Sequence, residues 1–392
     1  MGCFYNPYGS ILYYTIAIPE RFIEVHSLNI ELMKRYRYTW VTRGIMKFSL
    51  RTGLNPFASS FLLYGLVLSV LPVVGVLSNF DFNMILIKPD VYVPAILAYT
   101  WILYGPSLIY YFEVKGLPEL RTGLENIIPR KNIHQVDELI NWFISNIHEK
   151  YKYMSIALVT IAFLDAIFMV DYAKLHFHVK DLFDPFYLTA VSLMLLIVFM
   201  SGIGFTAVYY NAKLSRRLTK INVVIDPFHP DEFGGMMAIG RFSIKITLLF
   251  SSGAVLLPFL IQASSFLGNM AFYISILAAS LYILFVALSF FVPTYYFHTI
   301  ACREKQRYLE MIRGRYMLLF KSMLNHREKQ EHSDNVSTNL SGVLEIFLLG
   351  ECHRIIDEMK VYPFDIDIIL QLIGSIALPV ILTIFQLLIS IP

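Results

Sequence analysis

Seven long apolar segments dominate this chain, at 57–79, 89–112, 153–171, 186–210, 246–265, 268–296 and 367–390. Each is long enough to cross a hydrocarbon core, which takes about 20 helical residues. Of all residues, 56% are hydrophobic and only 16% are charged, whereas a soluble domain carries about 25% charged residues. We therefore expect an all-α, polytopic membrane helical bundle with about seven transmembrane helices and cytosolic helical extensions.

The distribution of lysine and arginine orients this bundle. With a cytosolic N-terminus, the outer segments hold only Lys88, Lys174 and Lys180, and all the rest of the 32 basic residues lie inside. Cytosolic loops of membrane proteins carry such an excess. The sequence thus predicts a cell-membrane protein with its N-terminus in the cytosol and its C-terminus outside. Its expected partners are the lipid bilayer and anionic inner-leaflet lipids. The net charge of +3 gives no reason to expect nucleic acid, and the sequence leaves homo-oligomerisation open.

The chain divides into four parts. The first, residues 1–56, mixes aromatic with basic side chains around Trp40, which is typical of a helix lying on the inner leaflet. The others are a six-helix membrane core at 57–297 with cytosolic loops 113–152 and 211–245, a cytosolic helical region at 298–366 with a flexible tract at 331–342, and a seventh transmembrane helix at 367–392.

Helical patterns also occur outside the spans. Pro118, Gly123 and Pro129 are expected to break the first half of the first cytosolic loop. Apolar periodicity then predicts helices at Val136–Tyr153, in a continuation of the sixth span toward His326, and at Val343–Lys360.

One carboxylate lies deep inside an apolar segment. Asp165 belongs to the third span, where an unpaired charge costs a few kcal/mol or more. Ionisable residues at such depth mark ion pathways or proton sites, so Asp165 is the candidate pore or ion residue. The alternative is a structural hydrogen bond to a neighbouring helix.

The most distinctive string of the chain is Asp226-Pro-Phe-His-Pro-Asp-Glu-Phe-Gly-Gly235 in the second cytosolic loop. Its imidazole and carboxylate groups suit a divalent cation, and its glycines would let the backbone approach a phosphate. The candidate site residues are Asp226, His229, Asp231 and Glu232. The string also fits a rigid turn, because prolines fix φ and glycines permit positive φ. The turn is the favoured interpretation.

Basic residues precede this string at the membrane edge. Arg216 and Arg217 are candidates for contact with a phosphate or a lipid headgroup. The chain has no nucleophile elbow, zinc-protease or phosphate-loop motif and no paired-cysteine motif. The sequence therefore names no catalytic residue and leaves both metal and cofactor unassigned.

Two further patterns have simple explanations. His176 and His178 could form an external metal site with Asp171 or Asp181, but incidental histidines in an interfacial loop are the favoured interpretation. The string Gly202-Ile-Gly-Phe-Thr-Ala207 fits a dinucleotide fingerprint but lies within the fourth span and follows no strand. Close packing of helices explains its small residues better.

Two strings together resemble a group of uncharacterised prokaryotic multi-pass membrane proteins. They are His229-Pro-Asp-x-x-Gly-Gly235 and Tyr362-Pro-Phe-Asp365, which opens the last apolar segment. This resemblance implies no known activity. Separately, the size and predicted topology are similar to those of insect odorant and gustatory receptors, and Thr383-Ile-Phe-Gln386 resembles their terminal motif. That similarity implies a ligand-gated cation channel.

The sequence supports three functional hypotheses. The first is a channel, transporter or sensor that acts through its bundle and Asp165. The second is a membrane enzyme that acts on a lipid headgroup or phosphate at the loop 226–235. The third is a membrane scaffold that binds a partner through its cytosolic helices. A polar pore would favour the first, a cavity converging on His229 the second, and exposed apolar side chains on the cytosolic helices the third.

Overall fold

The computed structural model describes residues 38–66, 89–168, 180–258, 269–329 and 336–362, with a few single positions besides. Every regular element within these ranges is a helix, and they contain no strand. The all-α prediction is therefore confirmed for the described part of the chain.

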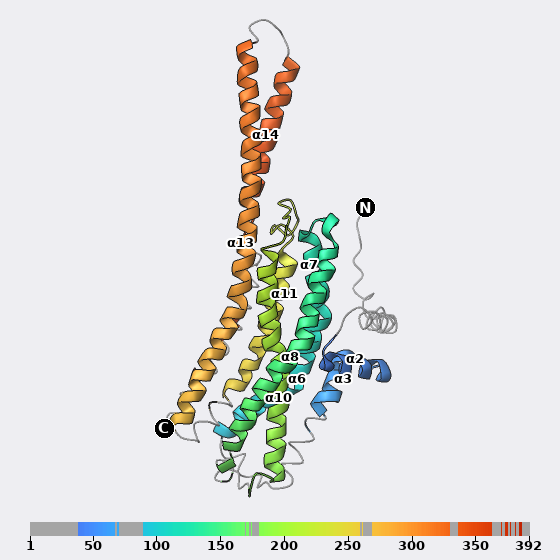
Figure 1. The fold of residues 1–392 in the computed structure, drawn as a ribbon, viewed down its shortest axis with the longest axis vertical. Coiled ribbons are helices and arrows are strands. Elements are labelled where there is room, and N and C mark those ends of the chain that lie inside the picture. Colours follow the sequence, from blue (N-terminus) through green and yellow to red (C-terminus); the bar gives the residue numbers. More distant parts are fainter. Residues whose placement is uncertain are drawn as a thin grey trace, which may run out of the picture.

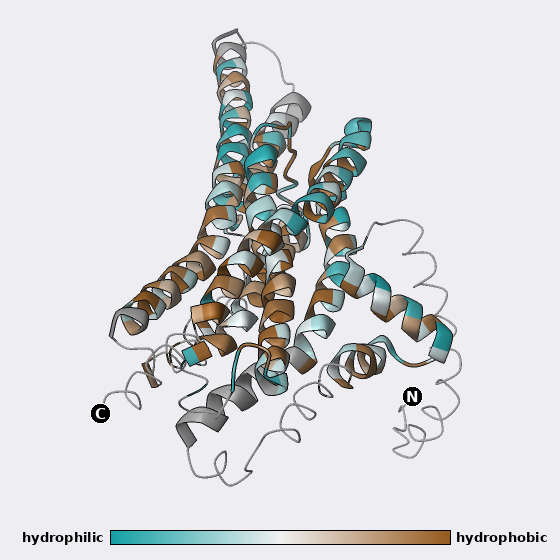
Figure 2. Ribbon diagram, turned by 60° about the horizontal axis from the view of Figure 1, so that its bottom comes forward, coloured by the Kyte–Doolittle hydropathy of each residue, from teal (hydrophilic) through white to brown (hydrophobic). Residues whose placement is uncertain are grey.

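Four of the described helices are long and apolar enough to cross a membrane. They are α8 (His134–Phe168), α10 (Pro185–Leu218), α11 (Met237–Ser251) with its continuation η4 (Ser252–Leu256), and α13 (Asn269–Lys329). The apolar stretches within them are, in the same order, His134–Phe168, Tyr187–Leu218, Met237–Leu256 and Phe272–Leu324. Figure 2 shows hydrophobic residues gathered along one part of these helices and hydrophilic ones toward the other end. This arrangement is compatible with a membrane protein.

The other three predicted spans are less completely described. Helix α6 (Pro89–Tyr111) matches the predicted second span, and the helices α3 (Pro56–Ser60) and η1 (Phe61–Leu66) cover the start of the first. The rest of the first span, the turn near Gly268 and most of the seventh span lie outside the described residues. His176 and His178, the candidate external metal ligands, also lie outside the described residues. Seven spans and the orientation therefore stay predictions.

Helix α2 (Trp40–Thr52) lies crosswise to the upright helices of the bundle (Figure 1). It buries Val41, Ile45 and Met46, while Arg43 and Lys47 on another face are exposed. The apolar face of α2 therefore packs against the other helices, and its predicted place on the inner leaflet stays a prediction. Residues 1–37 of the predicted interfacial part lie outside the described residues.

The first predicted cytosolic loop is more helical than the sequence suggested. Pro118 and Gly123 do not interrupt α7 (Leu117–Ile127), because Pro118 occupies its first turn, where no backbone N–H is needed. Gly123 lies against Ile239, with which a Cβ would collide at 2.6 Å. Of the three expected breakers, only Pro129 separates helices, between α7 and the short η3 (Arg130–Asn132).

The helix predicted at Val136–Tyr153 and the third span form one helix of 35 residues, α8. No proline or glycine occurs within α8, so nothing in the chain ends the helix at the predicted membrane boundary. Helix α10 packs along α8 through Gly202, where a Cβ would lie 2.1 Å from Ser155 Oγ. The small residues of the fourth span thus serve close helix contact.

Helices α13 and α14 (Val336–Glu358) form a long hairpin. Figure 1 shows it rising well beyond the ends of the other helices. From His298 to its end, α13 spans about 48 Å at 1.5 Å per residue. The sixth span therefore continues as a helix, while the cytosolic location of this continuation stays a prediction.

Two loop boundaries differ from the predicted ones. The second loop covers only 219–236, because α10 extends to Leu218 and α11 begins at Met237. Helix α14 begins at Val336, inside the predicted flexible tract 331–342. Its first turn holds Ser, Thr and Asn, residue types that are common near helix starts.

Candidate functional site

The loop 219–236 contains the unusual backbone that its sequence predicted. Glu232, Gly234 and Gly235 have φ of 60°, 66° and 89°. At Gly234 a Cβ would lie 1.8 Å from Ile225 Cγ2. Only glycine fits there, since it has no Cβ and adopts positive φ freely.

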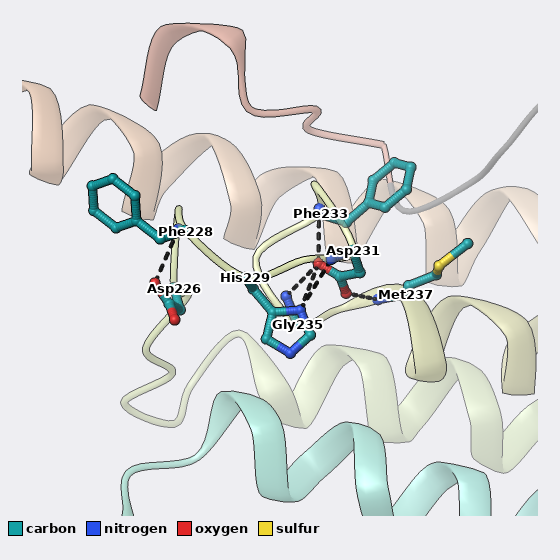
Figure 3. A network of polar contacts seen from close by, with 7 residues as sticks. All are labelled: Asp226, Phe228, His229, Asp231, Phe233, Gly235 and Met237. Carbon is teal, nitrogen blue, oxygen red and sulfur yellow. Dashed lines mark hydrogen bonds and ion pairs between the residues drawn. The ribbon is translucent and has the colours of Figure 1, made fainter. Parts of the chain in front are cut away.

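Asp231 organises this loop (Figure 3). Its Oδ1 accepts hydrogen bonds from the backbone N–H groups of Phe233 and Gly235, both at 2.9 Å, and its Oδ2 accepts one from Met237 at 3.2 Å. Met237 is the first residue of α11, so the carboxylate satisfies one N–H group at a positively polarised helix end. His229 Nδ1 lies 2.9 Å from Asp231 Oδ1. These contacts support the turn interpretation.

The other two carboxylates of the loop point to different partners. Asp226 Oδ1 accepts a hydrogen bond from Phe228 N at 3.0 Å, which closes a local turn. Glu232 forms an ion pair with Lys360 Nζ at 2.6 Å. The structure thus brings His229 and Asp231 together but not all four candidates. Among the described residues, no group of three or more His, Cys, Asp or Glu side chains is arranged to hold a metal ion.

The loop braces the base of the α13–α14 hairpin. Lys360, just after α14, donates its backbone N–H to Glu232 O at 3.2 Å, and its ammonium group lies 5.3 Å from the Phe233 ring centroid. Tyr362 stacks on His298 of α13 with ring centroids 4.3 Å apart. The string His229–Gly235 and the first residue of the string Tyr362–Asp365 therefore both contribute to this junction. Pro363 to Asp365 of the second string lie outside the described residues.

Arg303 adds a second brace, because its Nη1 donates to Thr219 O at 3.0 Å. Arg216 and Arg217 are exposed at the end of α10. The guanidinium of Arg217 lies over the Trp142 ring at 3.7 Å, which is a cation–π contact. Neither arginine makes a side-chain hydrogen bond or ion pair with the loop residues that the structure describes. The predicted lipid contact of this pair stays a prediction.

Asp165 is half-buried in α8. Its carboxylate makes no hydrogen bond or ion pair with any residue that the structure describes. Phe163, Leu164 and Phe168 around it are exposed, whereas the adjacent Ala166 is buried and accepts a hydrogen bond from Tyr187 of α10. Only one face of this stretch of α8 therefore packs against the described interior. The role of Asp165 in a pore stays a prediction.

Glu113 is a buried carboxylate that sequence reasoning missed. It lies in the π-helical turn η2 (Phe112–Gly116), a rare geometry that is frequent at functional sites. Glu113 Oε2 accepts hydrogen bonds from Thr39 N and Thr39 Oγ1, both at 3.1 Å. Burial raises the pKa of Glu113 to about 7, although the Thr39 hydrogen bonds and the charge of Arg43 oppose the shift. Its position directly after an apolar segment was the only signal in the sequence.

The hairpin carries an exposed apolar surface near its tip. Val343, Leu344, Phe347 and Leu348 of α14 are 54–63% exposed. Leu344, Phe347 and Leu348 follow Val343 by one, four and five residues, which places all four side chains on one broad face of the helix. We call these four residues the α14 patch. On α13, Met317, Phe320 and Leu324 are also exposed.

Comparison of the chain with models of known protein families, with characterised proteins and with solved structures finds no match. The similarity to prokaryotic membrane proteins and to insect receptors stays a prediction.

Proposed function

We propose that the protein is a membrane-anchored scaffold that self-associates through its α13–α14 hairpin. The observation that carries this proposal is the α14 patch. Large exposed apolar surfaces on a folded protein mark sites of association. Here the patch lies on a hairpin that extends beyond the rest of the bundle (Figure 1).

The hairpin is built to keep a defined direction. Lys305 Nζ donates to Met359 O at 3.3 Å, and Lys360 pairs with Glu232. Higher up, Arg315 pairs with Glu345 at 2.9 Å and joins α13 to α14. These contacts fix the base of the hairpin and hold its two helices together. The hairpin can therefore hold the α14 patch in a defined position for contact with a partner.

A second copy of the chain is the partner that this geometry favours. Copies in one membrane share the same orientation, so their hairpins project in the same direction and to the same height. A twofold axis along the membrane normal then brings each α14 patch against its counterpart. Pairing of two helical hairpins yields a four-helix bundle, which is a stable arrangement for apolar helix faces.

Light scattering of the full-length protein in detergent tests this proposal. The parent protein is expected to show twice the 45.2 kDa of one chain. Phe347→Glu/Leu348→Glu is expected to raise the dissociation constant of the dimer at least about 100-fold, because each dimer loses four buried apolar side chains. Gln306→Glu, on an exposed hairpin position outside the patch, should leave the mass unchanged. A parent protein that stays monomeric at every concentration would refute the proposal.

The channel hypothesis makes a different prediction about Asp165. If the protein is a scaffold, vesicles that contain the parent protein are expected to show no ion flux above that of protein-free vesicles, and Asp165→Asn is expected to leave this background unchanged. A flux that is present in the parent and falls in Asp165→Asn would support a channel, since this substitution removes the charge and keeps the shape.

A further inference from the structure

A cavity of about 430 Å³ lies between α2 and α8. None of its lining residues belongs to the loop 219–236 or to the hairpin, so it is separate from the features described above. Its polar lining is basic, with Arg43, Lys47, His148 and Lys152, and no carboxylate lines it. Its volume lies within the range of about 300–1,000 Å³ that is usual for small-molecule sites.

The basic residues form two edges of this cavity. Arg43 and Lys47 are four residues apart on α2, and His148 and Lys152 are four residues apart on α8. Side chains at this spacing share one helix face. Lys47 and Lys152 make no hydrogen bond or ion pair with any residue that the structure describes. Because like charges at close range repel, such a cluster is stabilised by an anion between its edges.

Arg43 is already oriented for such an anion. Its Nε donates to Tyr38 O at 2.8 Å, and its Nη2 lies 3.1 Å from His148 Nε2. Nη1 has no hydrogen-bond partner among the described residues. A guanidinium group held in this way offers a planar pair of donors, which matches the oxygens of a phosphate.

The position of the cavity suits the level of lipid headgroups. Lys152 directly precedes the predicted third span at 153–171. Trp40 and Tyr151 also line the cavity, and these aromatic types are enriched at the membrane–water boundary. Helix α2 lies crosswise to the bundle at this point (Figure 1).

We propose that the α2–α8 cavity binds a phosphate-bearing anion, with an anionic lipid headgroup as its source. Arg43 contacts two phosphate oxygens, Lys47 and Lys152 supply charge from opposite sides, and Trp40 packs against the carbon atoms of the headgroup. This proposal does not depend on self-association of the hairpin, because the cavity involves neither α13 nor α14.

Calorimetric titration of the full-length protein in phosphate-free detergent tests the proposal. The probes are dioctanoyl phosphatidic acid, dioctanoyl phosphatidylcholine and inorganic phosphate. We expect the parent protein to bind phosphatidic acid at least about tenfold more tightly than phosphatidylcholine, because the choline cation offsets the phosphate charge. Lys47→Gln/Lys152→Gln should weaken binding of phosphatidic acid at least about tenfold. Circular dichroism confirms that the variant is folded.

Lys131→Gln is the matched control, because it removes an exposed charge that does not line the cavity and belongs to no candidate site. Its affinity for phosphatidic acid should equal that of the parent. Binding of phosphatidic acid without binding of inorganic phosphate supports a lipid source. Binding of both, with both weakened in the double-lysine variant, supports a soluble phosphate compound. Equal affinities in the parent and the double variant would overturn the proposal. So would a parent protein that binds neither phosphatidic acid nor inorganic phosphate, or a loss in Lys131→Gln as large as that in the double variant.

Discussion

Replacing Gly234 with alanine is expected to lower the free energy of unfolding by about 3 kcal/mol. The residue has a φ of 66°, where a Cβ is unfavourable, and that Cβ would lie 1.8 Å from the buried side chain of Ile225. The chain must shift to relieve this contact. Because the loop also braces the hairpin, the shift is expected to loosen the junction at Lys360. Equilibrium unfolding in mixed detergent micelles measures the effect.

Two control substitutions separate this effect from a general sensitivity to mutation. Gly314→Ala lies in α13 with no heavy atom within 4 Å of the new Cβ, so we expect it to stabilise the protein by about 0.5–1 kcal/mol. His229→Ala removes the contact with Asp231 but leaves the backbone hydrogen bonds of that carboxylate in place. It is expected to cost less than about 1 kcal/mol. A stability loss in His229→Ala that depends on added divalent metal would instead support a metal site.

Glu113→Gln is expected to remove a pH dependence of stability. Burial raises the pKa of Glu113 from 4.5 to about 7, so the folded protein binds a proton that the unfolded chain releases at lower pH. The stabilisation from this proton is complete below about pH 4.5 and is lost as the pH rises toward 7. Above pH 7 the carboxylate is buried and charged, and the glutamine variant should be more stable by about 3 kcal/mol.

Thermal unfolding of the two proteins in detergent between pH 4.5 and 8.5 measures this difference. The charged and titratable neighbours of Glu113 are Arg43 and Tyr151, and both are unchanged in the variant. Glu138→Gln, at an exposed position of α8, is the matched control and should follow the parent protein. A glutamine variant whose stability falls with pH as steeply as that of the parent would assign the dependence to another group.

The helices were largely predictable because their signal is local. Long runs without proline or charge define most of α10 and the first part of α13, and apolar periodicity identified the part of α8 that precedes the predicted third span. The boundaries were less predictable. A helix does not end where a membrane ends, so α8 crosses the predicted boundary at Tyr153 without a break. Helix α11 likewise begins at Met237 rather than at 246, because Asp231 caps its backbone there.

The candidate site was predictable only where a single short segment determines it. The turn at 226–235 follows from its prolines, aspartates and glycines, and the structure has positive φ at Gly234 and Gly235. Its contact with Lys360 joins residues far apart in sequence, so no local pattern reveals it. The same limit applies to Glu113, whose burial depends on Thr39, and to the cavity, whose two basic edges lie about a hundred residues apart.

Oxidative cross-linking in native membranes tests self-association of the hairpin most directly. In a variant carrying Cys3→Ser, Cys302→Ser and Cys352→Ser, a single Phe347→Cys places one thiol in the α14 patch. The scaffold proposal predicts a disulfide-linked dimer of twice the 45.2 kDa chain mass, with much less dimer from Gln306→Cys outside the patch. Absence of the dimer in Phe347→Cys, or equal yields from the two positions, would contradict the proposal.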